Sequence, residues 1–229
     1  IWSMPGRHPM NDKQLTDEQI EELRAKHGRI YAVDFSADSE VVTFVLRAPV
    51  FSRTDAKVDE FHKIWPSLAN GTIPSATAEL LALVVHPEAA AAQKHMSAYP
   101  SDIYELATAV EELAGHNEFA ENESAVSPEQ RAKYGKRVFG FSIGGGLFAA
   151  RAMSKPEYGR FSEDCGGKPH RPTAAALLTA AWNCVLEPIT DTKKPVFEAA
   201  MQAHPWAALR LGLALFSATS TEARVRAKK

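Results

Sequence analysis

The chain has little cysteine, no surplus of charge of one sign and no long apolar run. Its two cysteines, Cys165 and Cys184, are too few for a disulfide framework, fit a reducing compartment and leave a single disulfide open. Basic residues number 26 and acidic residues 28, and this near balance disfavours nucleic acid as a partner. No apolar stretch reaches the ~18 residues of a membrane span. We therefore expect a cytoplasmic protein that binds neither nucleic acid nor membrane.

Motifs that indicate catalysis or a bound cofactor are also missing. The eight histidines show no HxxxH or HExxH spacing, and the cysteines lack the paired spacing of a zinc site. Gly144, Gly145 and Gly146 lack the Gly-Lys-Ser/Thr ending of a phosphate loop and so predict a hairpin turn. We expect no catalytic or metal-binding residue and no cofactor. The catalytic alternative is a pocket that joins Cys165 to two histidines, His170 and His204.

What the sequence does contain is an internal similarity. Residues 24–29, Arg-Ala-Lys-His-Gly-Arg, return as Arg-Ala-Lys-Tyr-Gly-Lys at 131–136. Further on, Met-Ser-Ala-Tyr-Pro at 96–100 returns as Met-Gln-Ala-His-Pro at 201–205. Two short matches in the same order and at nearly the same offset indicate two diverged copies of one module of about 100 residues.

The predicted organisation follows from this repeat. The acidic, glycine-containing stretch between the copies is typical of a linker, and the first nine residues resemble neither a module nor a signal peptide, which suggests a vector origin. The predicted parts are an N-terminal extension at 1–15, module 1 at 16–115, a linker at 116–126, module 2 at 127–220 and a basic tail at 221–229.

Each copy predicts a helix, a β-hairpin and then several helices. In the first copy, Thr16 and Gln19 form a capping box and Gly28 ends the helix. Alternating apolar residues from Ile30 to Leu46 predict the hairpin. Helices are then expected at 52–61, at 76–85, up to Met96 and after Pro100, with a loop at 66–74.

The second copy repeats this plan. Ser127 and Gln130 form the capping box, and strands are expected at 138–143 and 147–152. Helices are predicted at 154–161, at 173–186, up to Met201 and after Pro205, and Cys184 is expected to pack in the core beside Trp182. The predicted fold class is α+β, with two tandem modules that each pack a β-hairpin against helices.

Aromatic residues are the candidates for binding a partner. Trp65 and Trp206 each stand beside a proline at the boundary of an element, and tryptophan is common at interface hot spots. Tyr99, before the last helix of the first copy, and Phe216, on the apolar stripe of the last helix, complete the set. Packing in the core is the other interpretation of the two tryptophans.

The order of these features resembles the small tail assembly chaperones of tailed phages and prophages. The residues that carry the resemblance are Leu23-Arg-Ala-Lys-His-Gly-Arg29, Phe44-Val-Leu-Arg-Ala-Pro49, Leu83-Val-Val-His-Pro87 and Tyr99-Pro100. The resemblance covers about Thr16 to Gly115. The second copy matches more loosely, through Lys133–Lys136, Arg151-Ala152, Val185–Pro188 and His204-Pro205. Members of that family commonly carry one module, whereas this chain carries two.

The resemblance implies a non-enzymatic protein of the host cytoplasm. It would keep the tape-measure protein soluble and bring tail-tube subunits to it, with self-association along the tape measure, and the family offers no catalytic residues to carry over. Two other classes stay open: a structural component of a virion or injection particle, and a phage-encoded inhibitor or adaptor that binds a host protein.

Overall fold

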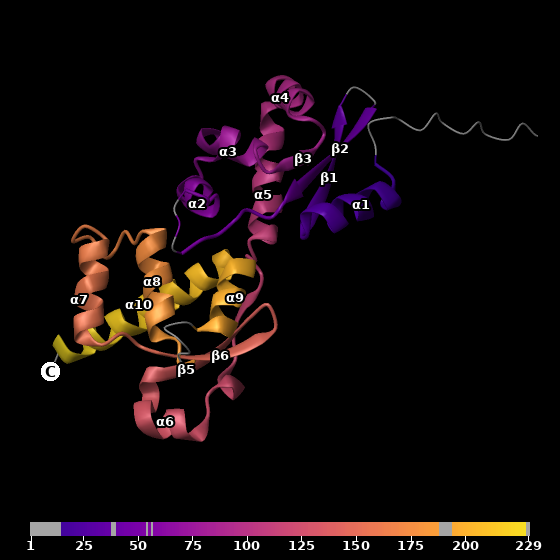
Figure 1. The fold of residues 1–229 in the computed structure, drawn as a ribbon. Helices are drawn as coiled ribbons and strands as arrows, with labels where there is room; N and C mark the ends of the chain where they lie inside the picture. Colours follow the sequence, from indigo (N-terminus) through magenta and orange to yellow (C-terminus); the bar gives the residue numbers. More distant parts are fainter. Residues whose placement is uncertain (1–14, 38–39, 54, 56, 188–193, 228–229) are drawn as a thin grey trace, which may run out of the picture. The chain divides into compact units, whose positions relative to one another are not determined.

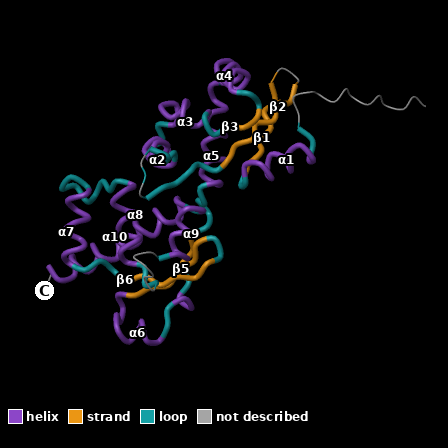
Figure 2. Tube along the Cα trace, in the orientation of Figure 1, coloured by secondary structure: helices purple, strands orange, loops and turns teal. Residues whose placement is uncertain are grey.

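The computed structural model describes all residues except 1–14, 38–39, 54, 56, 188–193 and 228–229. The chain forms two compact units (Figures 1 and 2). The first unit comprises residues 1–49 and 67–113, and the second comprises residues 50–66 and 114–229. The second unit therefore takes a short segment, 50–66, from the half of the sequence that was expected to form module 1.

The first unit is built on a three-stranded antiparallel sheet in the order β1-β2-β3. Its strands are β1 (Ile30–Ala37), β2 (Glu40–Arg47) and β3 (Val84–His86). Helix α1 (Asp17–His27) has the predicted capping box at Thr16 and ends at Gly28, whose φ of 75° suits glycine. Helix α1 packs on one side of the hairpin and α5 (Ile103–Leu113) on the other (Figure 1).

The remaining helical elements of this unit lie on the α5 side. They are η1 (Ile73–Ala76), α3 (Thr77–Leu81), α4 (Ala89–Ala98) and η2 (Pro100–Asp102). Helix α2 (Phe61–Asn70) contains the boundary between the two units, after Pro66. The core forms where α5 meets the hairpin, and Phe44, Leu46 and Leu106 are fully buried there.

The second unit has its own three-stranded antiparallel sheet, in the order β4-β5-β6. Its strands are β4 (Phe119–Glu121), β5 (Val138–Ile143) and β6 (Gly146–Arg151). Its helical elements are η3 (Glu123–Ala125), α6 (Pro128–Tyr134), η4 (Gly135–Arg137), α7 (Lys155–Asp164), α8 (Ala174–Cys184), α9 (Pro195–Ala203) and α10 (Pro205–Ala227). Helix α8 packs against α7 and α10. Gly212 of α10 makes this possible, because a Cβ there would lie 2.5 Å from the carbonyl oxygen of Leu177.

The α+β class predicted from the sequence is confirmed, since helices surround two small antiparallel sheets (Figure 2). Several local features recur in both units. Ala48 N donates to Arg29 O at 3.1 Å, and Ala152 N donates to Arg137 O at 2.8 Å. Both opening helices have a Thr/Ser-x-x-Gln capping box and a glycine C-cap whose N–H bonds to an arginine carbonyl four residues earlier.

Three predictions about elements were wrong. The described residues between 52 and 60 form no helix, and Phe61 begins α2, which continues through Pro66 to Asn70 into the expected loop at 66–74. The helix expected at 76–85 ends at Leu81, because Val84 and His86 pair with β2 and residues Val84–His86 form β3, a conformation that β-branched residues favour. In the second unit, Val185, expected in the helix at 173–186, likewise lies outside the helix and bridges to Ala150 of β6.

The ends of the second module also differ from the prediction. Residues 116–126, expected to be a linker, contain β4, which pairs with β5 over Phe119–Glu121. Residues 221–227, expected to be part of a basic tail, continue the backbone of α10. The proposed vector-derived residues 1–9 lie outside the described residues.

Candidate functional site

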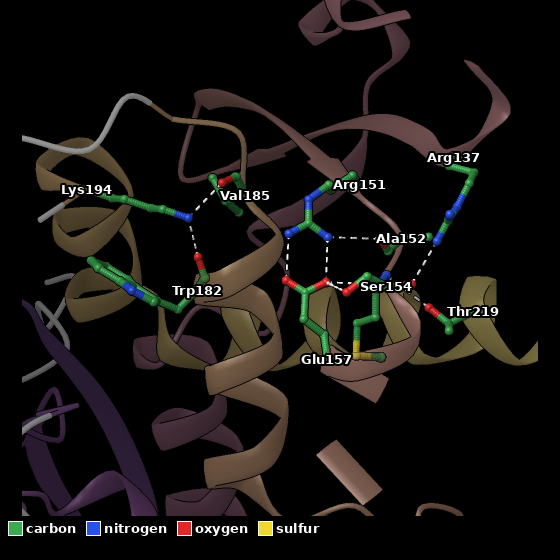
Figure 3. Close-up of polar contacts among 10 residues, drawn as sticks. Arg137, Arg151, Ala152, Ser154, Glu157, Trp182, Val185, Lys194 and Thr219 are labelled. Carbon is green, nitrogen blue, oxygen red and sulfur yellow. Dashed lines mark hydrogen bonds and ion pairs between the residues drawn. The ribbon is translucent and has the colours of Figure 1, made fainter. Parts of the chain in front are cut away.

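The most extensive polar cluster surrounds Glu157 in the second unit (Figure 3). Glu157 lies in the first turn of α7 and accepts two hydrogen bonds from Arg151 of β6, at 2.6 and 2.7 Å. Its carboxylate also accepts the backbone N–H and the hydroxyl of Ser154, at 2.7 and 2.6 Å. The hydrogen bonds from Arg151 lower the pKa of Glu157 to about 2, although partial burial opposes the shift.

The cluster extends along the connection from β6 to α7. Arg137 Nη2 donates to Met153 O at 2.8 Å, and Met153 N donates to the hydroxyl of Thr219 on α10 at 3.2 Å (Figure 3). Every oxygen of the Glu157 carboxylate is thus engaged by groups of the protein itself. This arrangement fastens α7 to the sheet rather than presenting an acid or a base to a substrate.

Lys194 is a buried charged residue, with 4% of its surface exposed. Its ammonium group donates to the carbonyl oxygens of Trp182 and Val185, the latter at 2.7 Å (Figure 3). These carbonyls belong to the C-terminal end of α8, where a cation satisfies acceptors that have no intrahelical donor. Burial lowers the pKa of Lys194. The guanidinium of Arg53 also packs over the indole ring of Trp182, and its Cζ lies 4.1 Å from the ring centroid.

The cysteines do not form a reactive site. Both are buried and free, so the disulfide left open by the sequence is not formed. Cys184 packs in the core at the end of α8, and burial raises the pKa of its thiol to about 12, which keeps it protonated at neutral pH. Among the described residues, no group of three His, Cys, Asp or Glu side chains could hold a metal ion.

The three residues of the catalytic alternative lie in different surroundings. Cys165 is buried at the end of α7, whereas His170 is exposed in the loop before α8. His204 lies against two glycines with positive φ: a Cβ on Gly115 would be 2.7 Å from its Cβ, and one on Gly144 would be 2.3 Å from its Nε2. The backbone at Gly115 and Gly144 therefore packs closely against the His204 side chain.

Trp65 and Trp206, predicted to bind a partner, contact each other within the second unit. Their ring centroids are 4.8 Å apart in a T-shaped arrangement, and Phe61 lies 6.2 Å from Trp65 and 6.4 Å from Trp206. Trp206 is buried and Trp65 is partly exposed. These contacts hold the segment 50–66 against the start of α10, so both tryptophans have a packing role.

Tyr99 and Phe216, the other two candidates, are both partly exposed. Tyr99 lies 5.0 Å from the ring of His95, which also packs against Phe35 and bonds to Asp102 through Nε2 at 2.8 Å. Phe216 stacks on Phe161 of α7 at 5.4 Å and on Tyr158 at 6.3 Å. Each of these aromatic rings therefore contributes to the packing of its own unit.

Sequence reasoning missed the pair formed by Asp59 and His62. Asp59 is 2% exposed and is bonded through its carboxylate to both the backbone N and the ring Nδ1 of His62. The His62 Nε2 is buried and has no hydrogen-bond partner among the described residues. The only signal in the sequence was an Asp-x-x-His spacing, which is common at the start of helices and is weak evidence.

A cavity lies in the first unit, between the end of α1 and the start of β1. It has a volume of about 590 Å³ and is lined by residues that include Arg24, Arg29, Ile30, Tyr31 and Glu112. Tyr31 is 43% exposed at its rim. The lining combines the guanidinium groups of Arg24 and Arg29 with the carboxylate of Glu112 and apolar surface, and Arg29 also donates through Nη2 to Leu113 O at 2.7 Å. Guanidinium groups of this kind can bind a carboxylate.

Comparisons with known proteins identify no relative. No protein-family model matches the chain, and neither the curated proteins nor the solved structures contain a match. None of the helices in the described part of the chain is long and apolar enough to cross a membrane.

Proposed function

We propose that the protein is a non-catalytic tail assembly chaperone of a phage or prophage. In the bacterial cytoplasm it would bind the tape-measure protein, keep it soluble and recruit tail-tube subunits. The proposal is supported by the positions of the motifs that resemble that family. Gly28 ends the opening helix, Arg47 ends the hairpin, and Tyr99 precedes η2, which leads into α5, the final helix of the first unit.

The observation that carries the proposal is the recurrence of this plan in the second unit. The capping box at Ser127, the glycine cap at Gly135 and the hairpin that ends at Arg151 follow each other in the same order. Arg47 and Arg151 also make the same contact, because each donates through Nη1 to the carbonyl of the following alanine at 3.3 Å. We infer an internal duplication, which would give one chain two binding modules and a gain in affinity for a long partner.

The proposal is tested by identifying what the tagged chain binds in its producing cells. Mass spectrometry of co-purified proteins should find tape-measure or tail-tube protein as the dominant partner. Purified long coiled-coil fragments of that tape measure should then bind the isolated chain, and absence of binding by every fragment would contradict the proposal. A host enzyme or immune protein as the dominant partner would indicate an inhibitor. Finding the chain in mature particles would indicate a structural component.

A further inference from the structure

The sheet of the second unit shows how an outer edge of this fold can accept a third strand. Ala152 N donates to Arg137 O, so the backbone N–H and C=O groups of Arg137 point toward the side of strand β6. Because these groups alternate in direction along a strand, the odd-numbered residues of β5 face β6 and the even-numbered residues face away from it. Strand β4 uses these outward groups. Asn122 N donates to Gly140 O at 2.8 Å, and Gly144 N donates to Glu118 O at 3.2 Å.

Among the described residues, no such strand pairs with the corresponding edge of the first unit. Because Ala48 N donates to Arg29 O, the odd-numbered residues of β1 face β2. The backbone groups of Ala32, Asp34 and Ser36 therefore point outward. All three residues are exposed, and no described residue pairs with their backbone groups. An edge of this length with unpaired N–H and C=O groups is a template for strand addition.

The sequence of the chain's own N-terminal segment contains a proline, Pro9, which disfavours pairing with this edge. When the capping residues Thr16 and Ser127 are aligned, the positions that match Phe119–Glu121 are His8, Pro9 and Met10. Pro9 falls at the position of Ala120, whose neighbours along the strand place its N–H toward β5. A proline there has no amide hydrogen to donate. Residues 8–10 lie outside the described residues.

The end of the edge indicates the chemistry of an occupant. A strand paired to β1 as β4 is paired to β5 runs antiparallel, so its carboxyl end reaches Ile30 and the arginine-lined cavity. In the second unit Glu123, two residues after β4, forms an ion pair with Arg131. The counterpart of Arg131 is Arg24, which lines this cavity and forms an exposed ion pair with Glu21. Such an exposed pair is weak and readily exchanged.

One difference determines the path of the occupant. Gly140 allows the chain after β4 to turn back closely, since a Cβ there would lie 2.0 Å from Asn122 O. The corresponding residue of β1 is Ala32, whose Cβ blocks that turn. The occupant must therefore continue straight along β1 toward Ile30.

We propose that the outer edge of β1 binds an extended segment of a partner protein, with a carboxylate at its carboxyl end held by Arg24 and Arg29. This inference goes beyond the tail-assembly proposal, because it predicts a peptide-binding edge whatever the identity of the partner. The main-chain hydrogen bonds provide affinity, and the carboxylate sets the register and the direction of the bound strand.

The test uses the full chain and a synthetic probe, an acetylated peptide with the sequence of residues 117–123. Amide hydrogen exchange at Ala32, Asp34 and Ser36 should slow about tenfold when the peptide concentration is ten times its dissociation constant. Gly144, whose N–H is already bonded to Glu118 O, should not change. Methylation of the peptide nitrogen at Asn122 should abolish binding, whereas methylation at Glu121, which faces away, should preserve it. This pair of peptides leaves the protein unaltered, so misfolding cannot explain the result.

The charge is tested separately. Arg24→Glu should weaken binding about fivefold or more, while Arg160→Glu, an exposed arginine on α7, should have no effect. A peptide with an amidated C-terminus and one with Glu123→Gln distinguish a terminal carboxylate from a side-chain carboxylate. Unchanged exchange at the three β1 amides with millimolar peptide overturns the proposal. The proposal is also overturned if these amides are protected in the free protein and the protection disappears when residues 1–14 are deleted. Dimerisation of the chain through the β1 edge would overturn it as well.

Discussion

Glu157→Gln should destabilise the second unit at neutral pH and remove most of its sensitivity to mild acid. Glutamine can still serve the capping box of α7, so the substitution mainly removes the charge that Arg151 holds. The pKa of Glu157 falls from 4.5 to about 2, which corresponds to an upper limit of about 3 kcal/mol. The side chains of Arg151 and Glu157 are 24% and 22% exposed, so solvent screening reduces the expected loss to about 1–2 kcal/mol.

The sign of the pH dependence follows from the lowered pKa. The stabilisation by ionised Glu157 is complete above pH 4.5 and is lost as the pH falls toward 2. Urea unfolding at pH 7 and pH 3 measures it, with tryptophan fluorescence as the probe because Trp65, Trp182 and Trp206 all belong to the second unit. The control is Glu163→Gln, an exposed position on the same helix. If Glu157→Gln lowers stability equally at both pH values, the ionic explanation is refuted.

Two further substitutions test the packing of α8. Gly212→Ala should destabilise the second unit by about 1–3 kcal/mol, because the added Cβ would meet Leu177 O. The control Gly159→Ala, on the open surface of α7, should be neutral or stabilising. Thermal unfolding compares the two variants. Lys194→Met should cost about 1–3 kcal/mol, because two buried carbonyls at the end of α8 lose their donor; urea unfolding measures it, and an unchanged midpoint would contradict the capping role.

The elements predicted correctly are those with local causes. The capping boxes at Thr16 and Ser127, the glycine cap at Gly28 and the two hairpins depend on residues close together in sequence, and the structure contains them all. The elements predicted wrongly depend on distant partners. Strands β3 and β4 have three residues each and exist because β2 and β5 offer them hydrogen bonds. Such short strands carry no reliable periodicity of their own.

The candidate sites show the same division. The sequence drew attention to Trp65 and Trp206, but their meeting at 4.8 Å depends on the segment 50–66 packing with the second unit. The capping box of Ser154 and Glu157 depends on neighbouring residues, whereas the pairing of Glu157 with Arg151 required β6 and α7 to pack together. The sequence pattern could not predict that β1 is an edge strand, because alternating residues occur in central strands as well as in edge strands.

By itself, the sequence determined the α+β class, the start of both opening helices and the two hairpins, because capping and alternation act over a few residues. The tertiary structure alone decided that residues 50–66 join the second unit, that Lys194 caps α8 and that β1 remains an outer strand while β5 is covered by β4. These outcomes depend on which surfaces meet after the chain folds, and the hydrogen bonds and burial that stabilise them join residues far apart in sequence.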